Sequence, residues 1–283
     1  MNEVRLLLVF FMEIIIRPKN KWWQIDWKEL WLFRDLFYFL SWRDIKVKYK
    51  QTIVGVLWAV FKPIATMIVF TIFFGKFAKM PSDGIPYPIF VYTGLLFWNL
   101  FATSLSDISG TFVSNERIIT KVYFPRIILP VSSIITNFVD FLIAAVILIG
   151  MMIVYGYTPS LTGILLLPVF IIMTVLAALG VGLLFGSLDV KYRDIRYVLP
   201  FFMQILIFIT PVIYPVSIVS ERFRWILGLN PMAGVIDAVR AGILGVKEID
   251  WLLLGVSAIC LLVYCVVGYV FFKKVERYFA DVI

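Results

Sequence analysis

The sequence predicts an all-α polytopic membrane protein. Of its 283 residues, 62% are hydrophobic and only 16% are charged, whereas about 25% of the residues in an average globular domain are charged. The charges gather in short clusters between long apolar runs. Because a spanning helix needs roughly 20 mainly apolar residues, we expect one membrane domain over residues 53–283. Six segments in it are long enough to span, at residues 53–77, 86–106, 129–155, 163–188, 197–220 and 251–272.

Residues 1–52 precede the first predicted span, and we expect a cytoplasmic arm followed by an amphipathic surface helix. The apolar run Leu6–Met12 is short, and no small-residue cleavage site follows it, so we interpret it as an uncleaved arm. The run Leu30–Leu40 has Arg34 and Asp35 near its centre and is too short to span. It is typical of a helix that lies along a membrane surface, although a small packed cytoplasmic helix would show the same pattern.

Basic residues mark the start of the first span and predict its orientation. Arg43, Lys46, Lys48 and Lys50 come directly before the apolar run. Anionic cytoplasmic lipid attracts such cations by about 1 kcal/mol each, and they mark the inner end of a span. With this end inside, 20 of the 26 Lys and Arg residues lie on the inner side, so we expect both termini in the cytoplasm. The same clusters account for the net charge of +8 without a nucleic-acid partner.

A turn separates the third and fourth predicted spans. The run Phe141–Leu188 carries no charge and is too long for one spanning helix. The sequence GYTPSLTG interrupts this run with Gly156, Pro159 and Gly163, which are typical helix breakers. We therefore expect the chain to reverse direction there.

The segment 221–250 between the fifth and sixth spans is mostly apolar, yet it contains Asn230, Pro231, Gly234 and Gly242. An ordinary outer loop would be more polar. Two short helices hinged near residues 229–232, dipping back into the membrane from outside, would explain this composition. A small extracellular helical cap is the alternative.

The composition excludes several classes of enzyme. Histidine is absent, and the two cysteines, Cys260 and Cys265, lie inside an apolar run. The sequence therefore has no HExxH motif, no Ser/His/Asp triad and no Cys/His metal set. It also lacks the phosphate-binding motif GxxxxGK[ST]. We expect no catalytic residue, metal or cofactor on this chain, and any ATP and Mg²⁺ must be bound by another subunit.

Three ionisable residues, Lys62, Asp107 and Asp140, lie within or beside predicted spans. Charges at membrane depth cost on the order of 2.5–3.5 kcal/mol, so each is expected to face protein or water. A proton relay would use such groups. Lys62 can instead extend toward the inner surface, and Asp107 lies at a cytoplasmic end, which argues against a relay.

Aromatic residues recur at helical spacing along three predicted spans. Packing against lipid or neighbouring helices is the ordinary explanation of such a stripe. A channel wall is the functional one, because flat aromatic faces stack on sugar rings and let a polymer slide. The candidate lining residues are Phe70, Phe74, Phe97, Phe101, Tyr197, Phe201 and Phe208.

Four short motifs in a fixed order carry a family resemblance. They are GVLWAVFKP at 55–63, KVYFPR at 121–126, TPVIYP at 210–215 and LNPM at 229–232. From about residue 25 to its end the chain resembles the permease subunit of bacterial polysaccharide ABC exporters. These type-2 ABC permeases move O-antigen, capsule or teichoic-acid chains. The resemblance implies export of lipid-linked polysaccharide across the bacterial plasma (inner) membrane by a homodimer of six-span subunits bound to two ATP-binding cassette ATPase subunits.

The resemblance also implies roles by position. The surface helix before residue 52 matches the family's interface helix, and Asn230 and Pro231 match part of an outer gate. Residues 115–126 match a coupling helix, and residues 189–196 match a second cytoplasmic contact. The implied ATPase-coupling residues are Glu116, Arg117, Lys121, Arg126 and Arg193.

Two other functions share parts of this pattern. A type-2 ABC permease for a small hydrophobic drug or lipid would have the same architecture, but an aliphatic cavity would suit it better than aromatic stripes. An integral-membrane transferase for lipid-linked sugars would need clustered carboxylates facing water. The sequence DAVRAG at 237–242 resembles a lipid-transferase motif only superficially, since the further spaced aspartates are missing.

Overall fold

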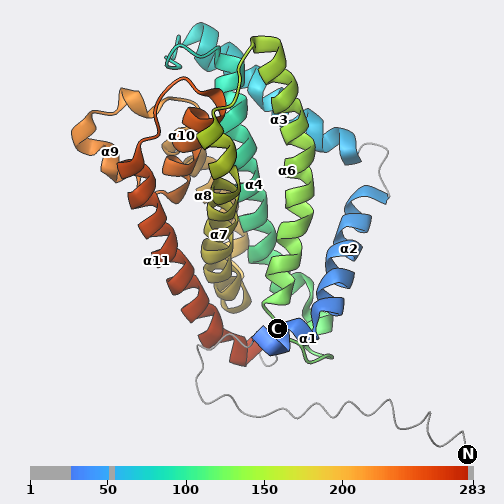
Figure 1. Cartoon of the computed structure of the whole chain (residues 1–283). Coiled ribbons are helices and arrows are strands. Elements are labelled where there is room, and N and C mark those ends of the chain that lie inside the picture. Colours follow the sequence, from blue (N-terminus) through green and yellow to red (C-terminus); the bar gives the residue numbers. More distant parts are fainter. Residues whose placement is uncertain (1–26, 51–54, 280–283) are drawn as a thin grey trace, which may run out of the picture.

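The computed structural model describes residues 27–50 and 55–279, which fold into helices joined by loops (Figure 1). No strand occurs in these two ranges, so the predicted all-α fold is confirmed. The predicted arm within residues 1–26 lies outside the described residues.

Within the described ranges, five helices are long and apolar enough to cross a membrane. They coincide with the first four predicted spans and the sixth, and α4 runs eight residues past its predicted end at residue 106. The five are α3 (Gly55–Phe70) with its π-helical continuation η2 (Thr71–Phe77), α4 (Tyr87–Ser114), α6 (Ile128–Tyr155), α7 (Leu161–Lys191) and α11 (Trp251–Val275), which the short η4 (Glu276–Tyr278) extends.

The predicted reversal between α6 and α7 is confirmed. Gly156 caps α6 with a positive φ of 73°, a conformation that glycine adopts without strain. Ser160 begins α7, and its Oγ accepts a hydrogen bond from the backbone N–H of Gly163 at 3.0 Å.

The fifth predicted span, residues 197–220, was wrong as a single helix. The helix there, α8, covers only Ile195–Ile209. Its 15 residues make about 22 Å at 1.5 Å per residue, which is less than the roughly 30 Å of a bilayer's hydrocarbon core. Pro211 ends α8 because it lacks an N–H and disfavours helical backbone at the preceding residue, Thr210, which is extended. After this break the chain continues to the one-turn η3 (Val216–Ile218).

The segment between α8 and α11 forms two short helices, as the sequence predicts. These are α9 (Glu221–Leu227) and α10 (Pro231–Leu244), whose axes are bent by 114° at the hinge between them. Every residue of α10 is buried, and it packs against α4, α7 and α11 (Figure 1). The hinge therefore returns α10 into the helix bundle, whereas no residue of α9 is buried.

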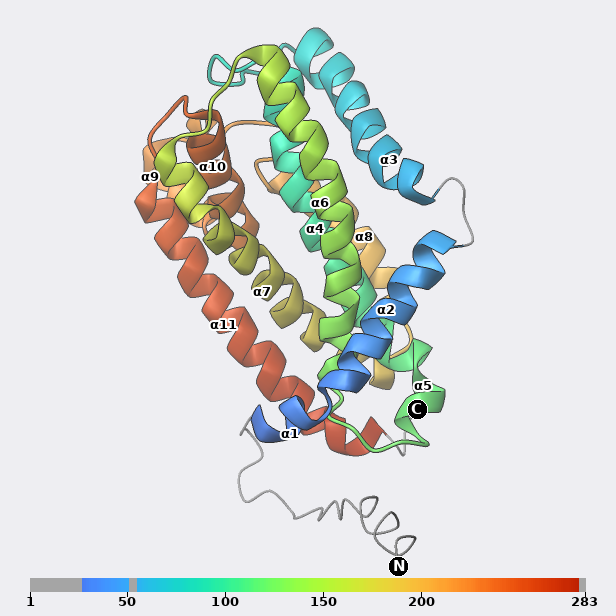
Figure 2. The same cartoon turned by 45° about the vertical axis from the view of Figure 1, so that its right-hand side comes forward.

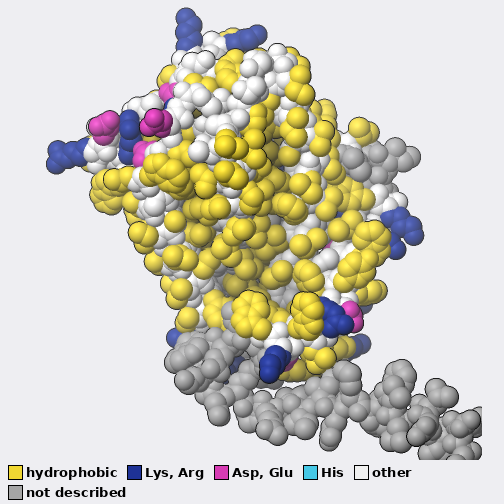
Figure 3. Space-filling model, in the orientation of Figure 1, with side chains coloured by type: hydrophobic (Ala, Val, Ile, Leu, Met, Phe, Trp, Pro, Cys, Tyr) yellow, Lys and Arg dark blue, Asp and Glu magenta, His cyan; other side chains and the backbone are white. Residues whose placement is uncertain are grey.

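Helix α7 packs extensively on α4, α10 and α11. A Cβ atom built on Gly268 of α11 would lie 1.9 Å from the carbonyl oxygen of Gly180 on α7, so these two helices meet at glycines. Helix α3 is peripheral, because only 6% of the residues in the apolar stretch that would cross the membrane are buried. Hydrophobic side chains cover the middle of the molecular face in Figure 3, and most charged side chains lie at its margins. Such an apolar band is what a bilayer requires.

The two ends of the bundle differ in composition and structure. At one end, Phe112 of α4 packs on Phe272 and Phe279 near the end of α11, and Leu40 of α2 joins this cluster. We call this the α5 end, because α5 (Glu116–Ile119) and α1 (Trp27–Leu32) also lie there (Figure 2). The opposite end, with α9 and α10, is the α10 end. Helix α2 (Arg34–Lys50) lies against α6 beside the α5 end (Figure 2).

Candidate functional site

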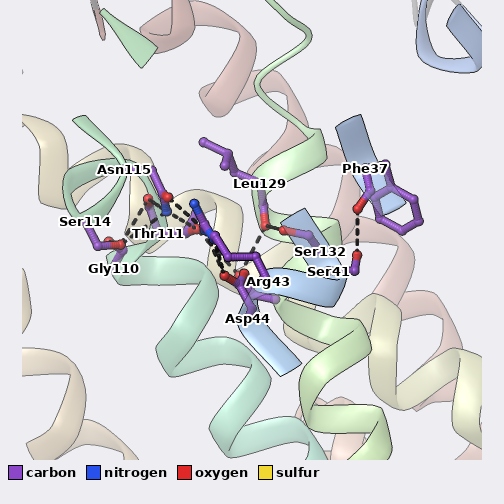
Figure 4. A network of polar contacts seen from close by, with 11 residues as sticks. Phe37, Ser41, Arg43, Asp44, Gly110, Thr111, Ser114, Asn115, Leu129 and Ser132 are labelled. Carbon is purple, nitrogen blue, oxygen red and sulfur yellow. Dashed lines mark hydrogen bonds and ion pairs between the residues drawn. The ribbon is translucent and has the colours of Figure 1, made fainter. Parts of the chain in front are cut away.

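Helix α5 protrudes at the α5 end and is fixed at its base by polar contacts. The side-chain amide of Asn115 donates to the backbone oxygen of Thr111 at 2.9 Å and thereby holds the end of α4. Arg43 of α2 donates to Asn115 Oδ1 at 3.2 Å and pairs with Asp44 (Figure 4). Ile119, the last residue of α5, is buried. Helix α2 and the base of α5 therefore form one connected unit.

Four of the predicted coupling residues lie on the surface of the α5 end. Glu116, Arg117 and Lys121 are exposed on and after α5, and Arg193 is exposed in the turn between α7 and α8. The fifth, Arg126, is placed differently. Its guanidinium donates to the backbone oxygen of Glu276 and lies 5.5 Å from the centre of the Phe279 ring. Arg126 is half-buried and thus holds the α5 loop to the end of α11.

Two contacts that sequence reasoning missed support these exposed turns. Tyr123 donates a hydrogen bond to Glu29 of α1 at 2.8 Å. Burial first, and then this carboxylate, raise the pKa of Tyr123 to about 12, so the phenol remains a donor at neutral pH. Arg196 pairs with the buried carboxylate of Asp189 at 3.1 Å and closes the turn that carries Arg193. The close spacing of Asp189 and Arg196 was the available signal for the second contact.

The predicted lining aromatics divide into exposed and buried groups. Tyr197, Phe201 and Phe208 are 81%, 64% and 56% exposed along α8, and their spacing of four and seven residues places them on one face. Phe70 and Phe74 of α3 and η2 are half-buried and contact each other edge to face, with ring centres 5.6 Å apart.

Phe97 and Phe101 contradict the expectation that they face a path. They are 0% and 2% exposed, and Phe97 packs against Phe141 of α6 with ring centres 5.3 Å apart. The cause is the position of α4, which is covered on several sides by α3, α6, α7 and α10. Helical spacing is the same for a covered helix and for an exposed one, so spacing alone did not distinguish these residues from those of α8.

A polar network connects α2 to α4 and α6. Lys48 donates to Asp140 at 2.5 Å and to Asn137 Oδ1 at 3.2 Å. Tyr49 donates a short hydrogen bond to the same Asp140 carboxylate, and Asn137 in turn donates to Asp107 at 2.7 Å. Burial, assisted by the Asp140 contact, raises the pKa of Tyr49 above its usual range. The two aspartates that the sequence singled out therefore belong to one structural network.

At the α10 end, the hinge residues hold the break after α8. Asn230 is the N-cap of α10. Its Oδ1 accepts from the backbone N–H of Met232 at 3.0 Å, and its amide donates to the Thr210 hydroxyl at 2.7 Å. Pro231 is the buried first residue of α10, where a missing N–H costs nothing. Of the two predicted gate residues, Asn230 thus connects α10 to the end of α8, and Pro231 starts α10.

Arg240 of α10 completes this connection and was not predicted as a functional residue. It is 2% exposed and donates to the backbone oxygens of Phe90 at 3.1 Å and of Pro211 and Val212 at 2.6 Å each. Its guanidinium lies 3.6 Å from the centre of the Phe90 ring, a favourable cation–π geometry. A planar fork with five N–H donors can satisfy several carbonyls that a broken helix leaves unpaired.

An ion-pair cluster lies beside Arg240. Lys247 pairs with Asp237 at 2.5 Å and lies 4.0 Å from Asp83, which also accepts a hydrogen bond from Ser217 at 2.5 Å. This cluster joins the loop before α4, η3, α10 and the loop after it. The α10 end is therefore closed by polar contacts among segments far apart in the sequence.

The chain is similar to known transport proteins over most of its length. The O-antigen export system permease protein RfbA of Klebsiella pneumoniae is 30% identical over 253 residues, which are 88% of this chain and 95% of that protein. A protein of the same name from Myxococcus xanthus is 28% identical over 76% of this chain and 82% of its own length. The polysialic acid transport protein KpsM of Escherichia coli is 23% identical over 71% of this chain and 78% of its own. Residues 35–244 match the family described as ABC-2 type transporter, and the chain therefore belongs to that family.

Proposed function

We propose that this chain is the transmembrane permease of an ATP-driven exporter that moves lipid-linked polysaccharide, of O-antigen, capsule or teichoic-acid type, across the bacterial plasma membrane. The observation that carries the proposal is similarity, over 76–88% of this chain, to permeases named for O-antigen export. A wide apolar band, with exposed aromatics on α8, supports it. A permease for a small hydrophobic drug or lipid is the alternative within the same family.

The proposed orientation places the α5 end in the cytoplasm, with both termini on that side. Under this orientation 20 of the 26 Lys and Arg residues lie on the inner side, as inner loops of membrane proteins require. The α10 end then faces outward, and Asn230, Pro231 and Arg240 hold the outer closure.

The proposed power source is an ATP-binding cassette ATPase in two copies, docked at the α5 end. The exposed side chains of Glu116, Arg117, Lys121 and Arg193 would contact it. Because Asn115 and Arg43 connect α5 to α2, movement of the ATPase would reach the surface helix as well as α4.

Two copies of the chain would enclose the polymer path. Helices α3 and α8 leave many apolar side chains exposed in the single chain, which suits a subunit seam and an adjacent channel. We place Tyr197, Phe201 and Phe208 on the path, with Phe70 and Phe74 beside it. The burial of Phe97 and Phe101 removes them from this proposal.

ATP hydrolysis separates this proposal from a self-sufficient enzyme. The purified chain alone should hydrolyse no ATP, and activity should appear only when a cognate ATPase is co-purified with it. Adding lipid-linked glycan to the reconstituted complex should produce ATP-dependent movement of the glycan across the membrane of proteoliposomes. Turnover by the isolated chain that survives removal of contaminants would refute the assignment. Movement of small hydrophobic compounds without glycan movement would favour the alternative.

A further inference from the structure

A cavity of about 430 Å³ lies among α2, α3, α4 and α6, on the side of the network that contains Asp140. It is partly open. Its apolar wall includes Trp58 and Phe141. Its polar lining is Lys48, Lys62, Asn99, Thr103, Asn137 and Asp140.

The charges in this cavity do not cancel. Asp140 has its counter-charge in Lys48 at 2.5 Å and a further donor in Tyr49. Within residues 27–50 and 55–279, the Lys62 ammonium has no ion pair and no hydrogen bond. Among the residues that line the cavity, Lys62 therefore lacks a counter-charge, and Asp107 of the same network lies behind Asn137, one hydrogen bond away from the lining.

A second group in the cavity also lacks a partner. In the same described ranges the side-chain amide of Asn99 makes no hydrogen bond, and the Thr103 hydroxyl uses its proton on the backbone oxygen of Asn99 at 2.6 Å. The Lys62 ammonium on α3 and the Asn99 amide on α4 thus line the same space, and both carry N–H donors that have no acceptor among the described residues. A lysine within a spanning helix is costly unless an anion or water compensates it.

The surroundings define the rest of the ligand. Trp58 of α3 lines the cavity, is exposed and stacks on the exposed Phe61, with ring centres 5.6 Å apart. Val69 follows at helical spacing, so an exposed apolar surface continues from the cavity along α3. A ligand with an anionic head in the cavity and a hydrocarbon chain on this surface would use both features. Phosphate is the anionic group that fits best, because it accepts several hydrogen bonds from ammonium and amide donors.

We propose that this cavity binds the phosphate group of a membrane lipid, with Lys62 as its cation and Asn99 as a second donor. The proposal rests on the proposed function and deepens it, because a glycan linked to a lipid through phosphate presents this chemistry at the membrane. Two sources share it: the phosphate of an isoprenoid carrier lipid, and that of an ordinary anionic phospholipid.

The test measures lipid binding without transport. The full chain is placed in phosphatidylcholine nanodiscs and titrated with a polyprenyl monophosphate or with phosphatidylglycerol, each competing with a photoactivatable analogue. Loss of one charged hydrogen bond should weaken binding in Lys62→Gln by roughly tenfold or more, and Lys62→Arg should retain most of it. Lys76→Gln is the matched control, since Lys76 is an exposed cation on η2 of the same span.

Preference for the polyprenyl probe supports a carrier-lipid site, and equal, Lys62-dependent affinity for both probes supports a general anionic-lipid site. Equal affinity of the wild type, Lys62→Gln and Lys76→Gln for each probe overturns the proposal. Unchanged thermal unfolding of Lys62→Gln shows that lost binding does not reflect misfolding. Glycan movement by the wild-type complex is measured separately, so failure of the lipid site and failure of the exporter assignment give different results.

Discussion

Arg240 is a buried cation that is compensated by backbone carbonyls and an aromatic ring. Three carbonyl oxygens and one aromatic face surround its guanidinium, while the nearby Asp237 is occupied by Lys247. The carbonyls of Pro211 and Val212 have no helical partners because the chain breaks there. Arg240 therefore makes the break after α8 tolerable within an apolar bundle, since an unsatisfied buried carbonyl costs about 1–3 kcal/mol.

The position of the Arg240 guanidinium requires a glycine at residue 94. A Cβ atom at Gly94 would lie 2.5 Å from Nη2 of Arg240, which cannot move aside without losing its carbonyl partners. We expect Gly94→Ala to lower the free energy of unfolding by about 1–3 kcal/mol through overpacking. Thermal unfolding of the detergent-solubilised chain measures this change.

Gly110→Ala on the same helix is the matched control, because nothing lies within 4 Å of its built Cβ. There the better helix propensity of alanine should leave stability unchanged or raise it by up to about 1 kcal/mol. Equal unfolding temperatures for the two variants would contradict the role assigned to Arg240.

At the scale of single helices, α4 and α8 carry similar aromatic spacing and occupy opposite environments. We expect the double variant Phe201→Leu with Phe208→Leu to fold normally, because exposed aromatics contribute little to packing within the chain. Export should nevertheless fall if these rings contact sugar faces. The measurement is surface glycan per assembled complex, with ATPase activity as a check on coupling.

The corresponding double variant on α4, Phe97→Leu with Phe101→Leu, should behave in the opposite way. Both rings are buried in the core, so their replacement should lower the unfolding temperature, and any loss of export should follow the loss of folded protein. Normal export by well-assembled α8 variants would remove α8 from the path.

Helix α5 is too short to be stable alone, and its contacts with α4 and α2 present its charges in a fixed direction. Reversing Arg117 and Lys121 to Glu should reduce export and ATPase stimulation together, while assembly of the chain stays intact because both side chains are exposed. Arg222→Glu on α9 changes an exposed cation at the other end and should affect neither. Wild-type coupling in the α5 variant would show that these charges do not contact the ATPase.

Sequence patterns predicted helix ends well where a few neighbouring residues determine them. They failed for features that depend on tertiary contacts. Gly156 and the hinge at Asn230 were predictable because breakers and caps act over a few residues. The fifth span was misjudged because hydropathy continues through Pro211, although the helix does not. The pairing of Lys48 with Asp140 joins residues 92 positions apart, and no local signal predicts such a contact.

Across the whole molecule, the two ends are built for different tasks. The α5 end exposes Glu116, Arg117 and Lys121 on and after α5. The α10 end also exposes charges, such as Arg222 on α9, but it holds in addition an internal set of charged contacts made by Arg240, Lys247 and Asp237. The band between them is apolar on its surface and contains the Asp140 network within it. The internal contacts of the α10 end suit a closed barrier, and the α5 end has no matching set among the contacts described above.

This difference gives a prediction about the orientation of the whole chain. A cysteine introduced at Lys121 should react with a membrane-impermeant maleimide only after the plasma membrane is permeabilised, whereas one at Arg222 should react in intact spheroplasts. Both positions are exposed, so a lack of labelling reflects the side of the membrane rather than burial. The unsubstituted chain is the control. Its Cys260 and Cys265 are half-buried on the spanning helix α11, so the maleimide should not label them before or after permeabilisation. Labelling at Lys121 in intact spheroplasts, with none at Arg222, would invert the proposed orientation. It would also move the ATPase contact away from α5, since ATP is available only on the cytoplasmic side.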